Sequence, residues 1–319
     1  MDIYAATTEY VSNTPITKSW PEFQSIFTHI ATCRPKHWQL PVKSCLAVGG
    51  IDEQAIPAVA AIACAQIGII LLDDMLDHDP RGEYHRLGHG AAANLGAAFQ
   101  IASLEAILRT DTPVMKKLEA LHSTNQMLLR VALGQDMDIQ VPTDETAYWR
   151  VVENKSASFF GTALFLGALL GGASEKITND VKRFGKLYGE MIQIHDDLND
   201  AMTEPAGPDW IQRRAPLPIL FAQIVDHPAR KRFLELCANI AQPDTLEEAQ
   251  QILIQCGAVS YCVDQLLHRH QAIQKILENA QLVNQQILNE LANEIVNPVW
   301  NIFNVLGIQP VSPLPTRLD

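Results

Sequence analysis

The sequence predicts an all-α protein. Helical periodicity of apolar residues is pervasive, while the alternation typical of strands is sparse. Small residues, mainly Ala, are dense on several helical segments, which allows close helix packing or leaves a cavity at the centre of a bundle. No change of composition divides the chain. We therefore expect one helical domain at residues 18–308, between a flexible N-terminal segment at 1–17 and a Pro-rich tail at 309–319.

Apolar periodicity, interrupted by turn residues, predicts where the individual helices begin and end. Pro80-Arg81-Gly82 ends a long helix that begins near Glu53, and Gly171-Gly172-Ala173 separates two later ones. Prolines and a glycine between residues 205 and 218 mark an irregular loop. The expected helices are 21–33, 38–48, 53–77, 89–109, 113–136, 144–171, 175–202, 228–238, 245–256, 258–279 and 282–306.

Composition narrows the classes of function. The chain has 319 residues, 47% of them hydrophobic and 19% charged, and its net charge of −12 argues against nucleic acid as a partner. The six cysteines show no metal-binding spacing, and we expect buried thiols in a reducing, cytoplasmic compartment. The longest apolar stretch, Ala55–Leu72, contains Gln66 and runs into aspartates, which favours a core helix over an integral membrane segment.

Two aspartate clusters share one internal spacing. They read Asp73-Asp74-Met75-Leu76-Asp77 and Asp196-Asp197-Leu198-Asn199-Asp200, and each follows an apolar run free of Pro and Gly. On a helix, residues four apart share a face, so the outer carboxylates of each cluster would repel each other unless cations lay between them. Magnesium prefers such oxygen ligands and shares its shell with substrate phosphates. A solvated acidic helix end is the alternative, but two matching copies with apolar flanks disfavour it.

Further motifs in the right order make the chain similar to the trans-isoprenyl diphosphate synthase (polyprenyl synthetase) family. The resemblance covers roughly Arg34 to Leu220. Besides the aspartate clusters, the segments that carry it are Gly134-Gln135-Asp136-Met137-Asp138, Lys155-Ser156, Gln193, and the group Pro205, Gly207, Asp209 and Leu217-Pro218.

The resemblance implies an isoprenoid-synthase-type bundle of about a dozen mostly antiparallel helices around a central cavity, assembled as a homodimer. It implies that magnesium, about three ions per site, assists the departure of diphosphate from an allylic prenyl diphosphate. The product would be of the geranylgeranyl or longer polyprenyl type, after condensation with isopentenyl diphosphate. The hydrocarbon cavity must be apolar and poor in water so that the carbocation survives.

Residue roles follow from the same resemblance. The implied metal ligands are Asp73, Asp74, Asp77, Asp196, Asp197 and Asp200. The implied catalytic residues are Asp73, Asp77, Asp196 and Lys155. The implied diphosphate-binding residues are Lys155, Gln193, Arg81, Lys36, Arg213 and Arg214. The chain pocket would be lined by Gly68, Ile69, Phe99 and Phe159.

Each basic or amide position has a plainer interpretation. Without the family match, a surface lysine paired with Glu153 or a neighbour is the favoured interpretation of Lys155. Gln193 is equally compatible with a buried amide bonded to backbone. For Arg213 and Arg214, solvated loop residues are the simpler account.

Departures from the family pattern leave the acceptor open. The family's basic segment before the first motif is reduced here to Lys36 and Pro41, and its lysine after the second motif is replaced by Glu204. Ordinary chain elongation is the leading hypothesis. A class I terpene cyclase, or a prenyltransferase with another acceptor, would use the same carboxylates. A non-catalytic partner subunit is the third hypothesis, although it would not need to retain repelling carboxylates.

Overall fold

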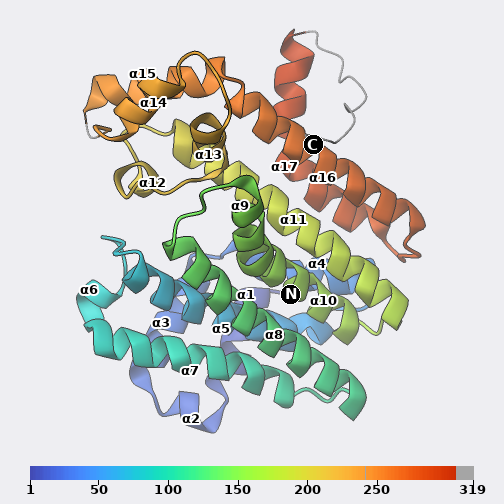
Figure 1. Ribbon diagram of the computed structural model, residues 1–319. Helices are drawn as coiled ribbons and strands as arrows, with labels where there is room; N and C mark the ends of the chain where they lie inside the picture. Colours follow the sequence, from blue (N-terminus) through green and yellow to red (C-terminus); the bar gives the residue numbers. More distant parts are fainter. Residues whose placement is uncertain (241, 307–319) are drawn as a thin grey trace.

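The structure, a computed structural model, describes residues 1–240 and 242–306, together with their side chains except those of residues 243 and 300–306. Helices and turns account for this part of the chain, which contains no strand (Figure 1). The expected tail at 309–319 lies outside the described residues. The helices are α1 (Ile3–Ser12), α2 (Pro15–Lys18), α3 (Pro21–Thr32), η1 (Lys36–Gln39), α4 (Leu40–Ala47), α5 (Asp52–Leu76), α6 (Tyr84–Leu87), α7 (His89–Leu108), α8 (Val114–Ile139), α9 (Glu145–Val152), η2 (Glu153–Ala157), α10 (Ser158–Leu170), α11 (Glu175–Met202), α12 (Pro208–Ile211), α13 (Leu217–Ile224), α14 (Arg230–Cys237), α15 (Pro243–Gln255), α16 (Ala258–Asn279) and α17 (Gln285–Leu306).

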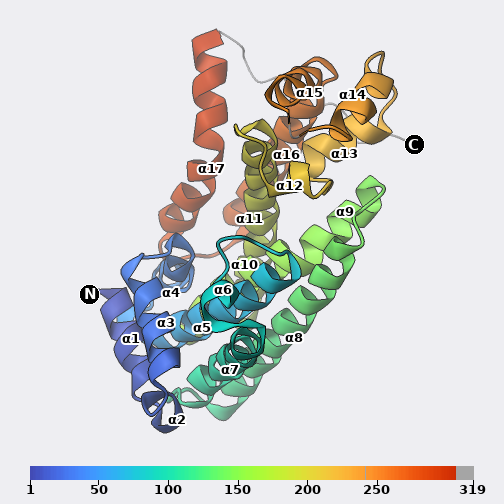
Figure 2. The same ribbon diagram turned by 90° about the vertical axis from the view of Figure 1, so that its left-hand side faces the viewer.

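Helix α5 runs through the centre of the main core. It begins with Asp52 and Glu53, whose negative charges are favourable at a helix N-terminus. Most of its length is apolar on all sides, which requires burial against several neighbours. Those neighbours are α1, α4, α7, α8 and α10, and α11 packs on the far side of α10 (Figures 1 and 2).

By length and composition alone, α5 and α7 could each cross a bilayer. However, 67% of the apolar stretch of α5 is buried within the fold, as expected of a core helix. Helix α7 packs along α5 over most of its length. The bundle itself therefore explains why α5 is so apolar.

The N-terminal segment differs from the flexible one that we expected. Residues 3–12 form α1, capped by Asp2, whose carboxylate accepts a hydrogen bond from the Tyr4 amide at 3.1 Å. Ile3, Tyr4 and Val11 are buried in the main core. The sequence patterning underestimated this helix because threonines and a glutamate interrupt its apolar residues.

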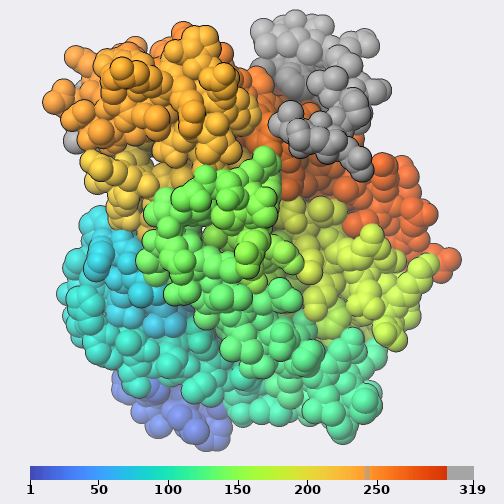
Figure 3. All heavy atoms as spheres, in the orientation of Figure 1, coloured from blue at the N-terminus to red at the C-terminus, as the bar shows by residue number. Residues whose placement is uncertain are grey.

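A smaller core lies at the C-terminal side of the bundle, where α14 and α15 form a lobe (Figure 3). Trp210, Phe233 and Leu253 are among its buried side chains. Helices α11, α13 and α16 each contribute residues to both cores, so the lobe is continuous with the bundle.

The expected loop at 205–218 contains two short helices, α12 and α13. Pro208 and Pro218 each lie in the first turn of one of them, where a missing amide proton costs nothing. Prolines that look like helix breakers in the sequence therefore start helices here.

Candidate active site

The first aspartate motif lies at the C-terminal end of α5. The side chains of Asp73 and Asp77 are 23% and 21% exposed, respectively. Burial raises the pKa of Asp73 to about 6; the charge of Lys155 opposes this shift, while that of Asp77 adds to it. Burial also raises the pKa of Asp74. A cation bound here would offset both the desolvation and the repulsion of these carboxylates.

A π-helical turn, η2, carries Lys155 into the site. It interrupts the continuous helix expected at 144–171, and π turns of this kind are common at functional sites. Lys155 Nζ donates to Asp138 Oδ2 at 2.8 Å and to Gln135 Oε1, and it lies 3.9 Å from Asp73 Oδ2. Lys155 is therefore an internal cation of the site and not a surface lysine paired with Glu153.

Two glycines make room for the π turn. On α8, a Cβ at Gly134 would lie 2.7 Å from Cγ of Lys155 and 3.0 Å from its backbone nitrogen. On α11, a Cβ at Gly189 would lie 2.6 Å from the carbonyl oxygen of Ser156. Helices α8 and α11 can thus close on the turn from both sides. In the Gly-Gln pair at 134–135, the glycine admits Lys155 and the glutamine binds it.

Gln135 and Arg214 both bind the last carboxylate of the first motif. Gln135 Nε2 donates to Asp77 Oδ1 at 2.9 Å while its own Oε1 accepts from Lys155. The guanidinium of Arg214 lies 2.6 Å from the same oxygen of Asp77 and 4.0 Å from Asp138 Oδ2. Arg214 is thus a site residue, and the segment after α12 is held over the end of α5.

Arg213 points elsewhere, although it is adjacent to Arg214. Its backbone is in the left-handed region (φ 57°), and its Nη2 donates to the carbonyl oxygen of Ala238 at 3.3 Å. Neighbouring residues on a loop often diverge in this way. Arg214 therefore lies among the site carboxylates, whereas Arg213 contacts the carbonyl oxygen of Ala238.

The second aspartate motif lies near the C-terminal end of α11. Burial raises the pKa of Asp196 and of Asp200. His195 Nδ1 lies 3.5 Å from Asp196 Oδ1 and favours its ionised form. The outer carboxylates of this motif are one turn apart, as those of the first motif are.

Asp197 does not behave like its neighbours in the motif. It is 4% exposed, and its Oδ2 accepts from the Tyr148 hydroxyl at 2.7 Å and from the Leu217 amide at 2.8 Å. Its Oδ1 accepts from Gln193 Nε2 at 2.8 Å. Burial raises the pKa of Asp197 to about 7, against the effect of these donors. Asp197 thus links α9, α11 and α13, and its role as a metal ligand stays a prediction.

Gln193 belongs to the same buried network. Its Oε1 accepts from the Ser156 hydroxyl at 2.6 Å while its amide group donates to Asp197. A chain of hydrogen bonds therefore runs from the π turn to the second motif. Through these contacts Gln193 positions Asp197, and its role in binding diphosphate stays a prediction.

Arg81 and Asp209 lie between the two motifs. Arg81 binds Asp79 through two hydrogen bonds, at 2.8 and 3.1 Å, and its charge acts on both Asp74 and Asp200. Burial raises the pKa of Asp209 to about 6, and the charge of Asp200 adds to this shift. The two motifs thus border one region, with Arg81 exposed at its edge.

The donor set of this region fits magnesium. Carboxylates outnumber the permanent cations of this region. The cations are Lys155, Arg81 and Arg214, and the carboxylates are Asp73, Asp74, Asp77, Asp138, Asp196, Asp200 and Asp209. Within the described residues, however, no three His, Cys, Asp or Glu side chains form a ready-made ion site. Magnesium keeps several water ligands and completes its coordination shell with substrate phosphates, so it suits carboxylates that are spread apart in this way.

The remaining predicted residues lie apart from this charged region. Gly68 contacts α7, since a Cβ there would lie 2.8 Å from the Gly96 carbonyl oxygen, and Ile69 packs against the main core. Phe99 is fully buried and stacks on Phe23, with ring centroids 3.9 Å apart. Gly68 therefore lies where α5 and α7 approach closely, and its place in a pocket floor stays a prediction.

Phe159 and Lys36 complete the predicted set. Phe159 is buried and packs edge-on against Phe160, at 5.5 Å between centroids. Lys36 is exposed on η1, and the next residue, His37, packs against the same Phe160 at 4.9 Å. Aromatic packing thus connects η1 to α10, while Lys36 forms no hydrogen bond or ion pair with the aspartates among the described residues.

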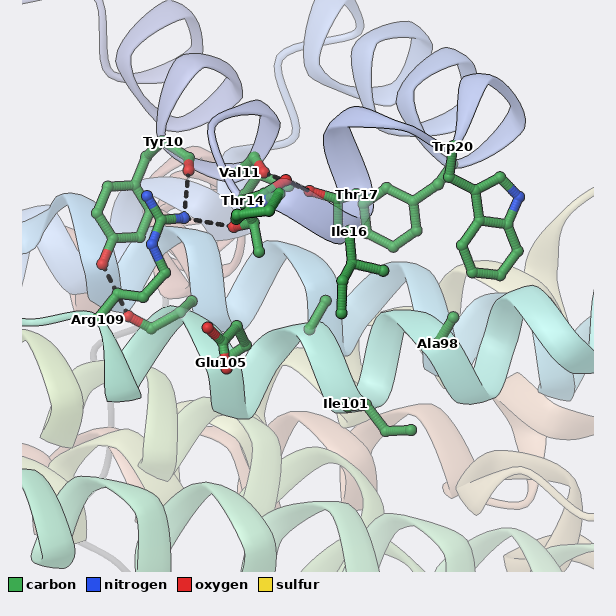
Figure 4. Close-up of a pocket in the computed structure, with 14 residues that line it drawn as sticks. Tyr10, Val11, Thr14, Ile16, Thr17, Trp20, Ala98, Ile101, Glu105 and Arg109 are labelled. Carbon is green, nitrogen blue, oxygen red and sulfur yellow. Dashed lines mark hydrogen bonds between the residues drawn. The ribbon is translucent and has the colours of Figure 1, made fainter.

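The cavity beside the motifs has a volume of about 210 Å³ and is lined by Lys155, Asp200 and Arg214 among others. A larger one, about 520 Å³, lies between the N-terminal helices and α7, away from the aspartates (Figure 4). It is mainly apolar, and its Arg109 already donates to the Tyr10 carbonyl oxygen at 2.8 Å. The larger cavity therefore offers no group for diphosphate chemistry.

Two residues of the site were missed by sequence reasoning. Tyr148 has no motif around it, and only the fold brings it to Asp197. Asp209 was noted for its spacing alone, but its raised pKa and its place between Asp200 and Arg214 make it part of the charged region. Apart from that spacing, the sequence offers one further signal for Asp209, which is a carboxylate among prolines in an irregular loop.

Known proteins share this fold and parts of this sequence. Geranylgeranyl pyrophosphate synthetase from Pyrococcus horikoshii superposes with a TM-score of 0.78 at 20% identity, covering 92% of this chain and 94% of that one. Geranylgeranyl pyrophosphate synthetase from Geoglobus acetivorans gives a TM-score of 0.76 at 22% identity, covering 92% and 95%. At these identities the likeness shows the fold alone.

Sequence comparison adds the family. The chain is 27% identical to geranylgeranyl diphosphate synthase of Methanosarcina mazei over 168 residues, which are 50% of this chain and 52% of that one. The matched region thus spans about half the length of that relative. The family model for polyprenyl synthetase matches residues 25–255. Because this match covers well over half of the chain, the protein belongs to the polyprenyl synthetase family.

Proposed function

We propose that this protein is a magnesium-dependent prenyltransferase that condenses an allylic prenyl diphosphate with isopentenyl diphosphate. The observation that carries the proposal is the placement of Lys155: a π turn holds it 2.8 Å from Asp138 and 3.9 Å from Asp73, at the end of the first aspartate motif. A cation bound among carboxylates that also suit metal ions is the arrangement needed to receive a diphosphate group.

Asp73, Asp77, Asp196 and Asp200 would hold magnesium. When bound, the metal neutralises the diphosphate and makes it a better leaving group. The carbon–oxygen bond of the allylic substrate breaks with its electron pair leaving on the diphosphate. The double bond of isopentenyl diphosphate then attacks the allylic carbon, and loss of a proton restores a double bond.

The protein cations have separate tasks in this reaction. Lys155 donates to the departing diphosphate oxygens, and Arg81 attracts a diphosphate at the exposed edge of the site. Arg214 neutralises Asp77 at 2.6 Å before substrate arrives. The Arg214 and Gln135 contacts are both to Oδ1 of Asp77, so Oδ2 of the same carboxylate would be available to a metal ion.

The product class is the finer part of the proposal. Relatives named geranylgeranyl and geranylfarnesyl diphosphate synthases match this chain at 24–27% identity. We infer a product of similar length. Gly68 and Ile69, which precede the first motif, carry no aromatic ring, so neither would close a path along α5.

The proposal includes a homodimer formed through α7 and α8. Large apolar side chains are exposed along both helices, a pattern that marks interaction surfaces. They are Ile101, Leu108, Val114, Met115, Leu118, Leu129, Leu133 and Ile139. A second copy of the same chain would cover this face with an equally apolar one.

The proposed location is cytoplasmic. All six cysteines are free thiols, and Cys45, Cys64 and Cys262 are buried. Free thiols of this kind persist in reducing compartments.

One assay tests the proposed activity. Purified protein and magnesium are incubated with geranyl, farnesyl or geranylgeranyl diphosphate, with and without isopentenyl diphosphate, and all products are analysed. Longer diphosphates that form only when isopentenyl diphosphate is present support the proposal. Hydrocarbons or alcohols formed without it would instead indicate a cyclase, and no turnover with any substrate would indicate a non-catalytic subunit.

A further inference from the structure

A second charged cavity lies outside the aspartate site, between α8, α10 and α11. Its volume is about 240 Å³. Arg130 reaches it from α8, and Lys182 and Lys186 reach it from α11. Glu153 is the one carboxylate among its lining residues. The net charge of the chain is −12, so this cavity departs from the overall charge by its local excess of positive side chains.

These three cations repel one another and lack ion-pair partners. Within residues 1–240 and 242–306, none of them forms a salt bridge. Lys182 Nζ donates to the Ser123 hydroxyl at 2.9 Å and lies 4.6 Å from the centroid of the Phe165 ring. Burial lowers the pKa of Lys182, and the charges of Lys186 and Arg130 lower it further, while the charge of Glu119 opposes the shift. An anion between them would relieve both effects.

Neutral hydrogen-bond donors complete the lining. Ser158 and Thr162 of α10 border the cavity and are 6% and 3% exposed, and Gln126 of α8 lies at its rim. No hydrogen bond among the described residues uses these three side chains. Gly161 lets the cavity form, because a Cβ there would lie 2.9 Å from Lys186 Cγ.

We propose that this cavity binds a small anion of the phosphate class, either a phosphate or a diphosphate group. Its volume equals roughly eight water molecules at about 30 Å³ each, which is too little for a drug-sized ligand. Arginine, ammonium and hydroxyl donors that converge on one cavity are suited to phosphate oxygens. Unlike the aspartate site, this cavity needs no metal ion to attract an anion.

Calorimetric titration with inorganic diphosphate tests the proposal. The full chain is titrated in chelator-containing buffer at low salt, so that the acidic aspartate site repels the probe. We expect one site per chain. Lys186→Gln removes a cavity cation and should weaken binding at least tenfold. Gln126→Glu places a carboxylate at the exposed rim without changing the core, and should weaken binding similarly.

Matched variants separate a site from general attraction. Arg183→Gln removes a charge from the same helix as Lys186, at a residue paired with Asp180 at 3.5 Å, and Gln251→Glu adds a charge on the surface of α15. Both should bind within twofold of the original chain. Repeating the titration with isopentenyl diphosphate distinguishes two sources of the anion. An affinity equal to that of inorganic diphosphate means that the cavity binds the diphosphate head group of such a compound. A weaker affinity means that the cavity binds the free anion.

Three results would overturn this site. They are the absence of saturable binding, unchanged affinity in Lys186→Gln and Gln126→Glu, or loss of affinity in Arg214→Gln alone, which would place the anion at the aspartates. Because the titration uses neither metal nor prenyl donor, its outcome is independent of whether the proposed transferase activity is correct.

Discussion

The hydroxyl of Tyr148 donates to Oδ2 of Asp197 at 2.7 Å, and both side chains are buried. The middle carboxylate of a metal-binding pattern is thereby used to join α9 to α11. Adjacent aspartates in one motif thus have different physical roles, because a helix turns successive side chains toward different neighbours.

Asp197→Asn should destabilise the protein, whereas Asp196→Asn should not. An amide at position 197 places an NH₂ group against donors that now bind carboxylate oxygens, and an unsatisfied buried group costs about 1–3 kcal/mol. Asp196 has no such donors besides His195. Urea unfolding of the metal-free variants measures the difference. Equal stability of the two variants would show that Asp197 is not a structural link.

Replacing the outer aspartates should abolish turnover and leave the fold intact. Asp73→Asn and Asp196→Asn each remove an oxygen ligand, and we expect each to lower kcat at least about a hundredfold, or about 3 kcal/mol. Asp136→Asn is the control, since Asp136 is exposed on α8 and binds Gln140. Activity near that of the original chain in either outer variant would contradict the metal assignment.

Gly134→Ala should displace Lys155. The added Cβ would lie 2.7 Å from Cγ of Lys155 and 3.0 Å from its backbone nitrogen, so the π turn must shift. We expect kcat to fall about tenfold or more, because a misplaced donor no longer meets the leaving group. Gly90→Ala on α7, where nothing lies within 4 Å, should retain activity. Similar activity in both variants would rule out this steric role.

The stability of the metal-free protein should depend on Asp209. Its pKa in the folded state is raised to about 6 from 3.8, so the folded protein holds a proton that the unfolded chain releases. Between pH 4 and 6 this group therefore lowers stability as pH rises, by about 1–3 kcal/mol in total. Asp209→Asn should remove this component, which urea titrations at several pH values measure. An unchanged pH slope in the variant would exclude it.

Leu129→Glu on α8 should yield monomers. A buried carboxylate at the centre of the proposed dimer face has no partner there, and its desolvation opposes association. Light scattering coupled to gel filtration measures the mass. Ile254→Glu, an equally drastic change at an exposed site on α15, should leave the mass unchanged. Dimers of Leu129→Glu at micromolar concentration would place the interface elsewhere.

The sequence by itself determined the helical class, the long helices and the two aspartate clusters. Periodicity and spacing are local properties, so α5 and α11 follow from their own residues. Gly134-Gln135 and Lys155 were likewise visible as a pattern, although their contact with each other was not.

Tertiary structure decided which side chain faces which. The neighbours Arg213 and Arg214 diverge, Asp197 is bonded to Tyr148 and Leu217, and Gly68 contacts α7. The π turn at Lys155 forms where glycines on α8 and α11 allow those helices to approach. These outcomes depend on contacts between residues that are distant in the chain. The sequence contains both residues of each contact, but it does not show that they meet.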